Sequence, residues 1–233
     1  MKKILLFLLS CNLLFAIDVF KYNGTAVDLK TGKKLYSDFH EEYSANGKHL
    51  YSVVNYKDPS GKIFAKKNID FQKNGARANF KLEDFRDGYI EGSEVIGNSN
   101  KAKFIFKKNS EEELKEEILE TPNPSVFDGG FDIYMKDNWA AIMEGKRKIF
   151  SICAPSQMDC FKFAAFKTGE EIYKEKEAVV VRVELNNYIL SKLVKPIIIT
   201  YDKNTKRILQ FDGISNINNE NGKSYVVRIT YEY

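Results

Sequence analysis

The sequence has two histidines, His40 and His49, and both fall in segments that are typical of β-strands. His40 is followed by Glu41 and Glu42, so the triplet offers the side-chain types of general acid–base catalysis. In a strand, however, His40 and Glu42 share one face while Glu41 points the other way, which favours a solvated surface. The sequence also lacks the nucleophile-elbow, zinc-protease and phosphate-loop motifs. We therefore predict that the protein is not an enzyme.

The most unusual local motif is Asp128-Gly129-Gly130-Phe131-Asp132. Its acids and glycines could cradle an ion or a ligand head group. A structural role is favoured, in which Asp128 caps a helix and the glycines let the chain approach a strand closely. A deep polar pocket containing Asp128, Asp132 or His40 would instead indicate an enzyme. The run Asp84-Phe85-Arg86-Asp87 similarly favours a turn with a surface ion pair over a buried clamp.

Three cysteines occur, at Cys11, Cys153 and Cys160. The last two flank Pro155 and end two apolar runs, so they predict a disulfide across the base of a hairpin in an oxidising compartment. A redox pair or half of a metal site are the alternatives. Their spacing is not Cys-x-x-Cys, and the sequence offers no further ligands to complete a zinc site. We predict no metal site and no cofactor.

The N-terminus is typical of a secretory signal peptide, with Lys2 and Lys3 ahead of the apolar run Ile4–Phe15. We expect residues 1–16 to be removed by cleavage after Ala16, which places the protein in the periplasm. The alternative is a lipid anchor on Cys11, because Leu8-Leu9-Ser10-Cys11 is similar to a lipobox. The run is shorter than the roughly 20 apolar residues of a membrane span, and we predict no transmembrane helix in the mature chain.

Most of the remaining chain alternates apolar and polar residues between short turns, most clearly from Tyr225 to Tyr233. Three segments break this pattern: an acidic helix expected over Ser110–Leu119, an apolar helix over Ser125–Glu144, and a short helix over Tyr188–Val194. We predict a mainly β (α+β) fold, in which a highly curved antiparallel sheet or incomplete barrel wraps one or two helices. Residues 17–233 form one domain in this prediction, with a helical insertion at about 110–145.

The expected central helix carries the only tryptophan. Large side chains recur in it at helical spacing and are candidates for the lining of a cavity between sheet and helix: Phe127, Phe131, Tyr134, Trp139 and Ile142. An apolar cleft with few polar groups suits a lipid or another hydrophobic ligand. The alternative is that these rings are simply core. Formal charge is +4, and loss of Lys2 and Lys3 leaves +2, a balance that argues neither for nor against nucleic acid; we predict no nucleic-acid partner.

The C-terminal pattern Ile197-Ile198-Ile199-Thr200-Tyr201-Asp202, together with Phe127-Asp128-Gly129-Gly130-Phe131-Asp132, resembles uncharacterised periplasmic proteins of Gram-negative bacteria. The expected architecture is remotely similar to the LolA/LolB-like lipoprotein-carrier superfamily. Export, aromatic richness and the missing catalytic motifs lead us to expect an exported periplasmic binding or carrier protein, with a lipid or other hydrophobic ligand held between curved sheet and helix. The alternative is an envelope protein-interaction or sensor module that has an envelope protein as partner and no small-molecule ligand.

Overall fold

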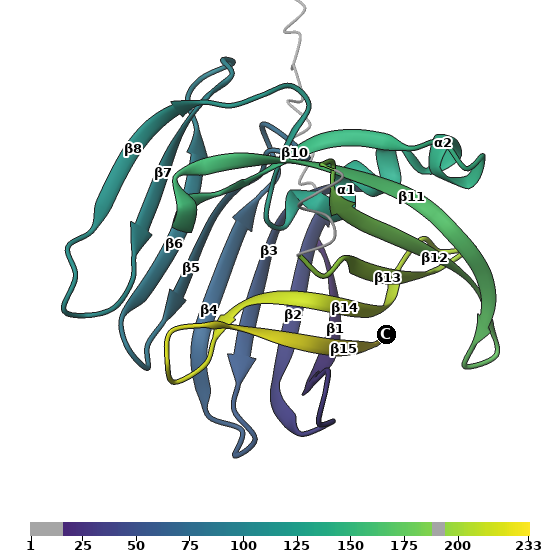
Figure 1. The fold of residues 1–233 in the computed structure, drawn as a ribbon, viewed down its shortest axis with the longest axis horizontal. Helices are drawn as coiled ribbons and strands as arrows, with labels where there is room; N and C mark the ends of the chain where they lie inside the picture. The colour runs from purple at the N-terminus through teal and green to yellow at the C-terminus, as the bar shows by residue number, and fades with distance from the viewer. Residues whose placement is uncertain (1–15, 188–193) are drawn as a thin grey trace, which may run out of the picture.

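The structure is a computed structural model that describes residues 16–187 and 194–233. Residues 1–15 of the expected leader, Cys11 among them, and most of the expected helix over Tyr188–Val194 lie outside the described residues. Within them, all strands belong to one fifteen-stranded sheet (Figure 1). The sheet contains β1 (Asp18–Asp28), β2 (Lys34–Ala45), β3 (Lys48–Lys57), β4 (Ile63–Asp70), β5 (Asn79–Asp84), β6 (Tyr89–Val95), β7 (Lys101–Lys107), β8 (Lys115–Glu120), β9 (Ser125–Phe127), β10 (Lys148–Ala154), β11 (Asp159–Tyr173), β12 (Lys176–Leu185), β13 (Ile197–Asp202), β14 (Ile208–Asn218) and β15 (Ser224–Glu232).

Two antiparallel meanders make up the sheet. One runs from β1 to β8 and the other from β10 to β15, and β1 pairs with β15 to join them. The three-residue strand β9 adds to β10 in parallel at the far edge. Neighbours along the chain are mostly neighbours in the sheet because the short turns between strands permit antiparallel pairing.

The sheet cannot be flat, because the two strands at its opposite edges follow each other in sequence. Fifteen strands side by side would be about 67 Å wide at a spacing of about 4.8 Å. The connection from β8 to β9 has four residues, Thr121–Pro124, and reaches at most about 18 Å. The sheet therefore curls until its edges approach. Figure 1 shows β10 arching back across the top of the molecule, and the turn η1 (Pro155–Gln157) lies against β6 and β7. The predicted highly curved antiparallel sheet is confirmed.

The two helices, α1 (Gly130–Asp137) and α2 (Trp139–Met143), follow β9 and are separated by Asn138. The prediction of one helix over Ser125–Glu144 is wrong at its start, because Ser125–Phe127 pairs with β10 instead. The helices pack against β10–β13, where the Trp139 ring meets the Tyr201 ring edge-on with 5.5 Å between centroids. Among the described residues, neither helix is long or apolar enough to span a membrane.

The acidic helix expected over Ser110–Leu119 is not formed. Asn109 Oδ1 accepts hydrogen bonds from the backbone N–H groups of Glu111 and Glu112, which closes a turn. The chain then enters β8, where Leu119 lies opposite Ala102 of β7. Pairing with an available sheet edge outweighs the local helix-capping signals of this segment. Among the described residues, the helical part of the expected insertion is thus residues 130–143, not about 110–145.

The predicted disulfide is confirmed, since Cys153 and Cys160 are bonded and stand opposite each other where β10 pairs with β11. Reducing it is expected to lower the free energy of unfolding by about 2–3 kcal/mol, because a bridge across so short a loop restricts the unfolded chain only modestly. Urea unfolding with and without reductant measures this. The double variant C153A/C160A should unfold like the reduced wild type. An unfolding midpoint unaffected by reductant would contradict the expectation.

Candidate functional site

A cavity of about 470 Å³ lies between the inner faces of β1–β4 and β13–β15, and residues of β9 and α1 cover it. Eight isoleucines, six tyrosines and three phenylalanines line it, so most of its wall is apolar or aromatic. The alternation of strand residues explains this, because every second side chain of each strand points to the concave side of the curved sheet. Size and lining are those of pockets that take small ligands.

The predicted cavity residues divide between this lining and the cores. Phe131 lines the cavity. Tyr134, Trp139 and Ile142 are buried in the core between the helices and β10–β13, and Phe127 is buried in a second core with Phe104. The cavity instead takes Ile133 and Lys136 from α1. The helical spacing that selected these five residues marks the apolar face of a helix, and that face packs on the sheet.

A buried ion pair lies inside the cavity. Lys67 Nζ on β4 is 2.7 Å from Asp128 Oδ2, and Asn216 Nδ2 donates a hydrogen bond of 3.2 Å to Asp128 Oδ1. Burial lowers the pKa of Lys67, but the Asp128 carboxylate and the neighbouring Tyr56 outweigh burial and raise it above its ordinary value. Lys67 is therefore charged, and Asp128 acts through an ion pair instead of the predicted helix cap, since Gly129 occupies the cap position of α1.

A second carboxylate, that of Glu91 on β6, is buried and also faces the cavity. The Tyr89 hydroxyl donates to its Oε2 at 2.8 Å, and the Ser156 N–H donates to its Oε1 at 3.1 Å. Burial raises the pKa of Glu91, while these two hydrogen bonds lower it in part. Both oxygens of this carboxylate are thus engaged by the protein itself.

The more exposed part of the lining carries two further ion pairs. Asp132 pairs with Lys136 one turn along α1, and Arg207 lies 3.8 Å from Glu42, which also accepts a hydrogen bond from Tyr22. Burial raises the pKa of Asp132, and the Lys136 ammonium opposes this shift. Apolar rings and paired charges therefore alternate along this side of the cavity.

Both histidines line the cavity, so the expectation of a solvated face for His40 and Glu42 is wrong. His40 Nε2 is 3.3 Å from Asp38 Oδ1, and its ring stacks on the Tyr22 ring with 4.4 Å between centroids. His49 Nε2 is 2.8 Å from Ser52 Oγ, and burial lowers the pKa of His49. The two face inward because the sheet curls around them.

Asp128, Asp132 and His40 all line this one cavity, but its wall is mostly apolar or aromatic, so it differs from the deep polar pocket that would have indicated an enzyme. They do not form one constellation. Asp128 forms an ion pair with Lys67, Asp132 forms one with Lys136, and His40 lies beside Asp38. Among the described residues, no group of three or more histidine, cysteine or acidic side chains is placed to hold a metal ion.

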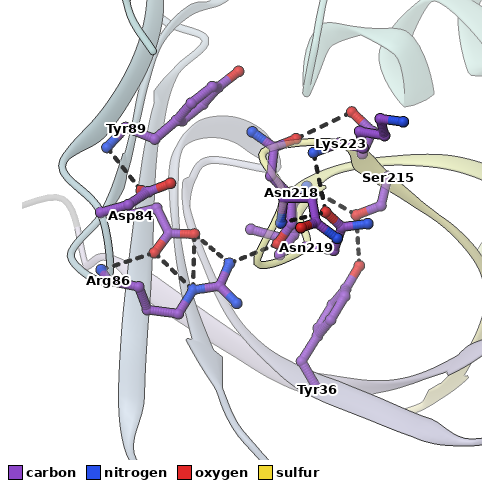
Figure 2. Close-up of polar contacts among 12 residues, drawn as sticks. Tyr36, Asp84, Arg86, Tyr89, Ser215, Asn218, Asn219 and Lys223 are labelled. Atoms are coloured by element: carbon purple, nitrogen blue, oxygen red, sulfur yellow. Dashed lines mark hydrogen bonds and ion pairs between the residues drawn. The ribbon is translucent and has the colours of Figure 1, made fainter. Parts of the chain in front are cut away.

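One end of the half-barrel is held by Arg86, which follows β5 (Figure 2). Its guanidinium binds the Asp84 carboxylate and donates to the Asn218 carbonyl oxygen at 2.8 Å, and it lies over the Phe64 ring. Asp84 is buried but Arg86 is exposed, so the ion pair lies in a turn at the surface, as expected, with its carboxylate side buried. It links the β5–β6 turn to the β14–β15 hairpin. Figure 2 also shows Tyr36 bonded to Ser215 at 2.7 Å, a second contact between the two meanders.

Sequence reasoning missed Lys67, Asp38 and Glu91. A signal was present, because Lys67 shares a strand face with Ala65 and Ile69, and Asp38 shares one with Tyr36. A charged residue at an inward position of a strand is a candidate for a polar group inside a cavity.

No family model matches the chain, and no curated protein matches it with significance. A solved structure does match: a β-barrel-like protein of a domain of unknown function, DUF1849, from Brucella abortus. The two chains are 8% identical, with a TM-score of 0.56 over 92% of this chain and 95% of that one. This likeness shows a distant barrel-like fold that the two proteins share. The resemblance to LolA/LolB-like carriers is not confirmed by it and stays a prediction.

Proposed function

We propose that the protein is an exported periplasmic binding protein that holds a lipid or another largely apolar ligand in the cavity between the curved sheet and α1. The cavity carries this proposal: about 470 Å³, lined mainly by isoleucine, tyrosine and phenylalanine. Export is supported by the signal-like N-terminus and by the Cys153–Cys160 disulfide, which suits an oxidising compartment.

Binding is proposed ahead of catalysis because most charged groups of the cavity are paired with one another or hydrogen-bonded by the protein. Lys67, Lys136 and Arg207 each face a carboxylate, and Glu91 is held by Tyr89 and Ser156. Such pairs orient a ligand without leaving a free base and nucleophile side by side. The interaction or sensor module expected as the alternative stays a prediction.

Filling the cavity is expected to abolish binding without unfolding the protein. Ala154 of β10 lines the cavity and is half-buried, so the indole of Ala154→Trp would occupy ligand space. We expect the variant to lose at least about tenfold in affinity for a fluorescent apolar dye, as direct steric exclusion from the site would produce. The matched control is Ala140→Trp on the exposed face of α2, which should bind the dye like the wild type.

Native mass spectrometry of protein released from the periplasm completes the experiment, because it reads the bound ligand and the mature N-terminus together. A chain beginning at Ile17 with a co-purifying apolar molecule is expected. Dye binding that survives Ala154→Trp would contradict the proposed site, and ligand-free protein that takes up no dye would contradict the proposed function.

A further inference from the structure

The charges that line the cavity do not balance. Five carboxylates face it, against two lysines and one arginine. Each of these cations already lies beside a carboxylate: Lys67 beside Asp128, Lys136 beside Asp132, and Arg207 beside Glu42. Glu91 and Asp38 have no lysine or arginine beside them; Glu91 takes two hydrogen bonds from Tyr89 and Ser156 instead, which leaves Asp38.

Asp38 is deeply buried, with 3% of its surface exposed, and it lines the cavity. Its Oδ1 has no hydrogen-bond partner in the part of the chain that the structure describes. The neighbouring group able to carry positive charge is His40, whose Nε2 lies 3.3 Å away and is likewise without a hydrogen bond there. A buried carboxylate oxygen without a donor is costly, so its retention needs an explanation.

The backbone makes room for this carboxylate. Gly24 of β1 stands directly opposite Asp38 in the β1–β2 pairing. A Cβ at Gly24 would lie 2.1 Å from Asp38 Oδ1 and 2.9 Å from the Tyr231 ring. The missing side chain therefore leaves the space that the Asp38 carboxylate occupies, with Oδ1 packed over the β1 backbone.

Aromatic rings surround the same place. Tyr56 of β3 stands opposite Asp38 on its other side, and Tyr231 of β15 stands opposite Gly24, so these residues form one row across the inner face of the sheet. In the adjacent row Tyr22 stands opposite His40, and the Tyr231 ring meets the His40 ring edge-on with 5.8 Å between centroids. Burial raises the pKa of Tyr22 and of Tyr231 well above the ordinary value, so these rings stay neutral.

A buried carboxylate in a row of tyrosines suits an organic cation, because aromatic ring faces and a carboxylate both attract positive charge where water is excluded. We propose that the cavity binds an amphipathic ligand whose positively charged nitrogen, an amine or quaternary ammonium, docks against Asp38 between Tyr22, Tyr56 and Tyr231. The apolar part of the ligand then lies along the isoleucine-rich wall. An anionic head group is disfavoured, since Lys67 is already neutralised by Asp128 and the lining carries an excess of carboxylates.

This inference rests on the proposed function, and three probes of equal chain length separate the two: decyltrimethylammonium, decanol and decanoate, each below its micelle concentration. Competition with the bound apolar dye at pH 8, where an ordinary imidazole is neutral, measures their affinities. The wild type should bind decyltrimethylammonium at least about tenfold more tightly than decanoate. Asp38→Asn should lose about tenfold for the cation while its affinity for decanol stays within about twofold.

The matched control is Glu41→Gln, which removes a carboxylate from the same strand on its outer face, where Glu41 pairs with Lys21. It should leave all three affinities unchanged. Decanol binding without any preference for the cation, or a preference for decanoate, overturns the inference and leaves the proposed function standing. Failure of the wild type to bind the dye or any of the three probes overturns both. The comparison of probes on the wild type needs no variant, so it decides the matter even if Asp38→Asn does not fold.

Discussion

Replacing Lys67 by methionine is expected to lower the free energy of unfolding by about 3–5 kcal/mol, the loss seen when one member of a buried ion pair is removed. The physical reason is that Asp128 would keep its charge inside the cavity with only the Asn216 amide to stabilise it. Methionine fills nearly the same volume, so lost packing contributes little. Urea unfolding followed by tryptophan fluorescence measures the effect, with Trp139 as the single reporter.

Two further variants show whether the ion pair is the cause. Lys66→Met alters the adjacent lysine, which points to the opposite face of β4, and should change stability by less than about 0.5 kcal/mol. The double variant K67M/D128N removes both charges and should recover part of the loss. If K67M were as stable as K66M, the pair would contribute nothing to folding.

Adding a methyl group at Gly130, as in Gly130→Ala, is expected to lower the free energy of unfolding by about 3 kcal/mol or more, because the added group has no room. A Cβ there would lie 2.1 Å from the carbonyl oxygen of Ala76 and 2.5 Å from its carbonyl carbon. Both atoms belong to the backbone, so no rotation of a side chain can relieve the clash. Gly130→Ala should therefore shift the thermal and urea midpoints strongly, or prevent folding.

Gly169 supplies the control for this prediction. It lies in β11 with nothing within 4 Å of an added Cβ, and its φ is not in the left-handed region. Gly169→Ala should change the free energy of unfolding by less than about 0.5 kcal/mol. Equal stability of the two alanine variants would show that α1 can move away from Ala76 at little cost.

The strands were predictable because their signal is local and repeated. In β12, Val179, Val181 and Val183 alternate with half-buried Val180 and Arg182, and this period of two survives in the structure. The Ser110–Leu119 segment failed because its outcome depends on a distant partner. Its acids match a helix start, yet the open edge of β7 offers hydrogen bonds to the whole segment that follows the turn.

The candidate site was predictable only in part, because it depends on which strand faces meet after the sheet has curled. Phe131 was found from the helical pattern, but Asp38 and Lys67 gain their roles from Gly24 and Asp128, far from them in sequence. Strand order decides such encounters, and the local pattern of the chain carries little information about it.

The short connection between β8 and β9 also limits how far the two edges of the sheet can separate. It is fastened at both of its ends: Thr121 bonds to the Asn100 carbonyl oxygen, and the Pro124 carbonyl oxygen accepts the Ser151 N–H. The connection and its hydrogen bonds therefore hold the two edges of the sheet together at this end of the half-barrel. We expect the two edges of the sheet to separate least at this connection and most toward the opposite end of β8, which begins at Lys115.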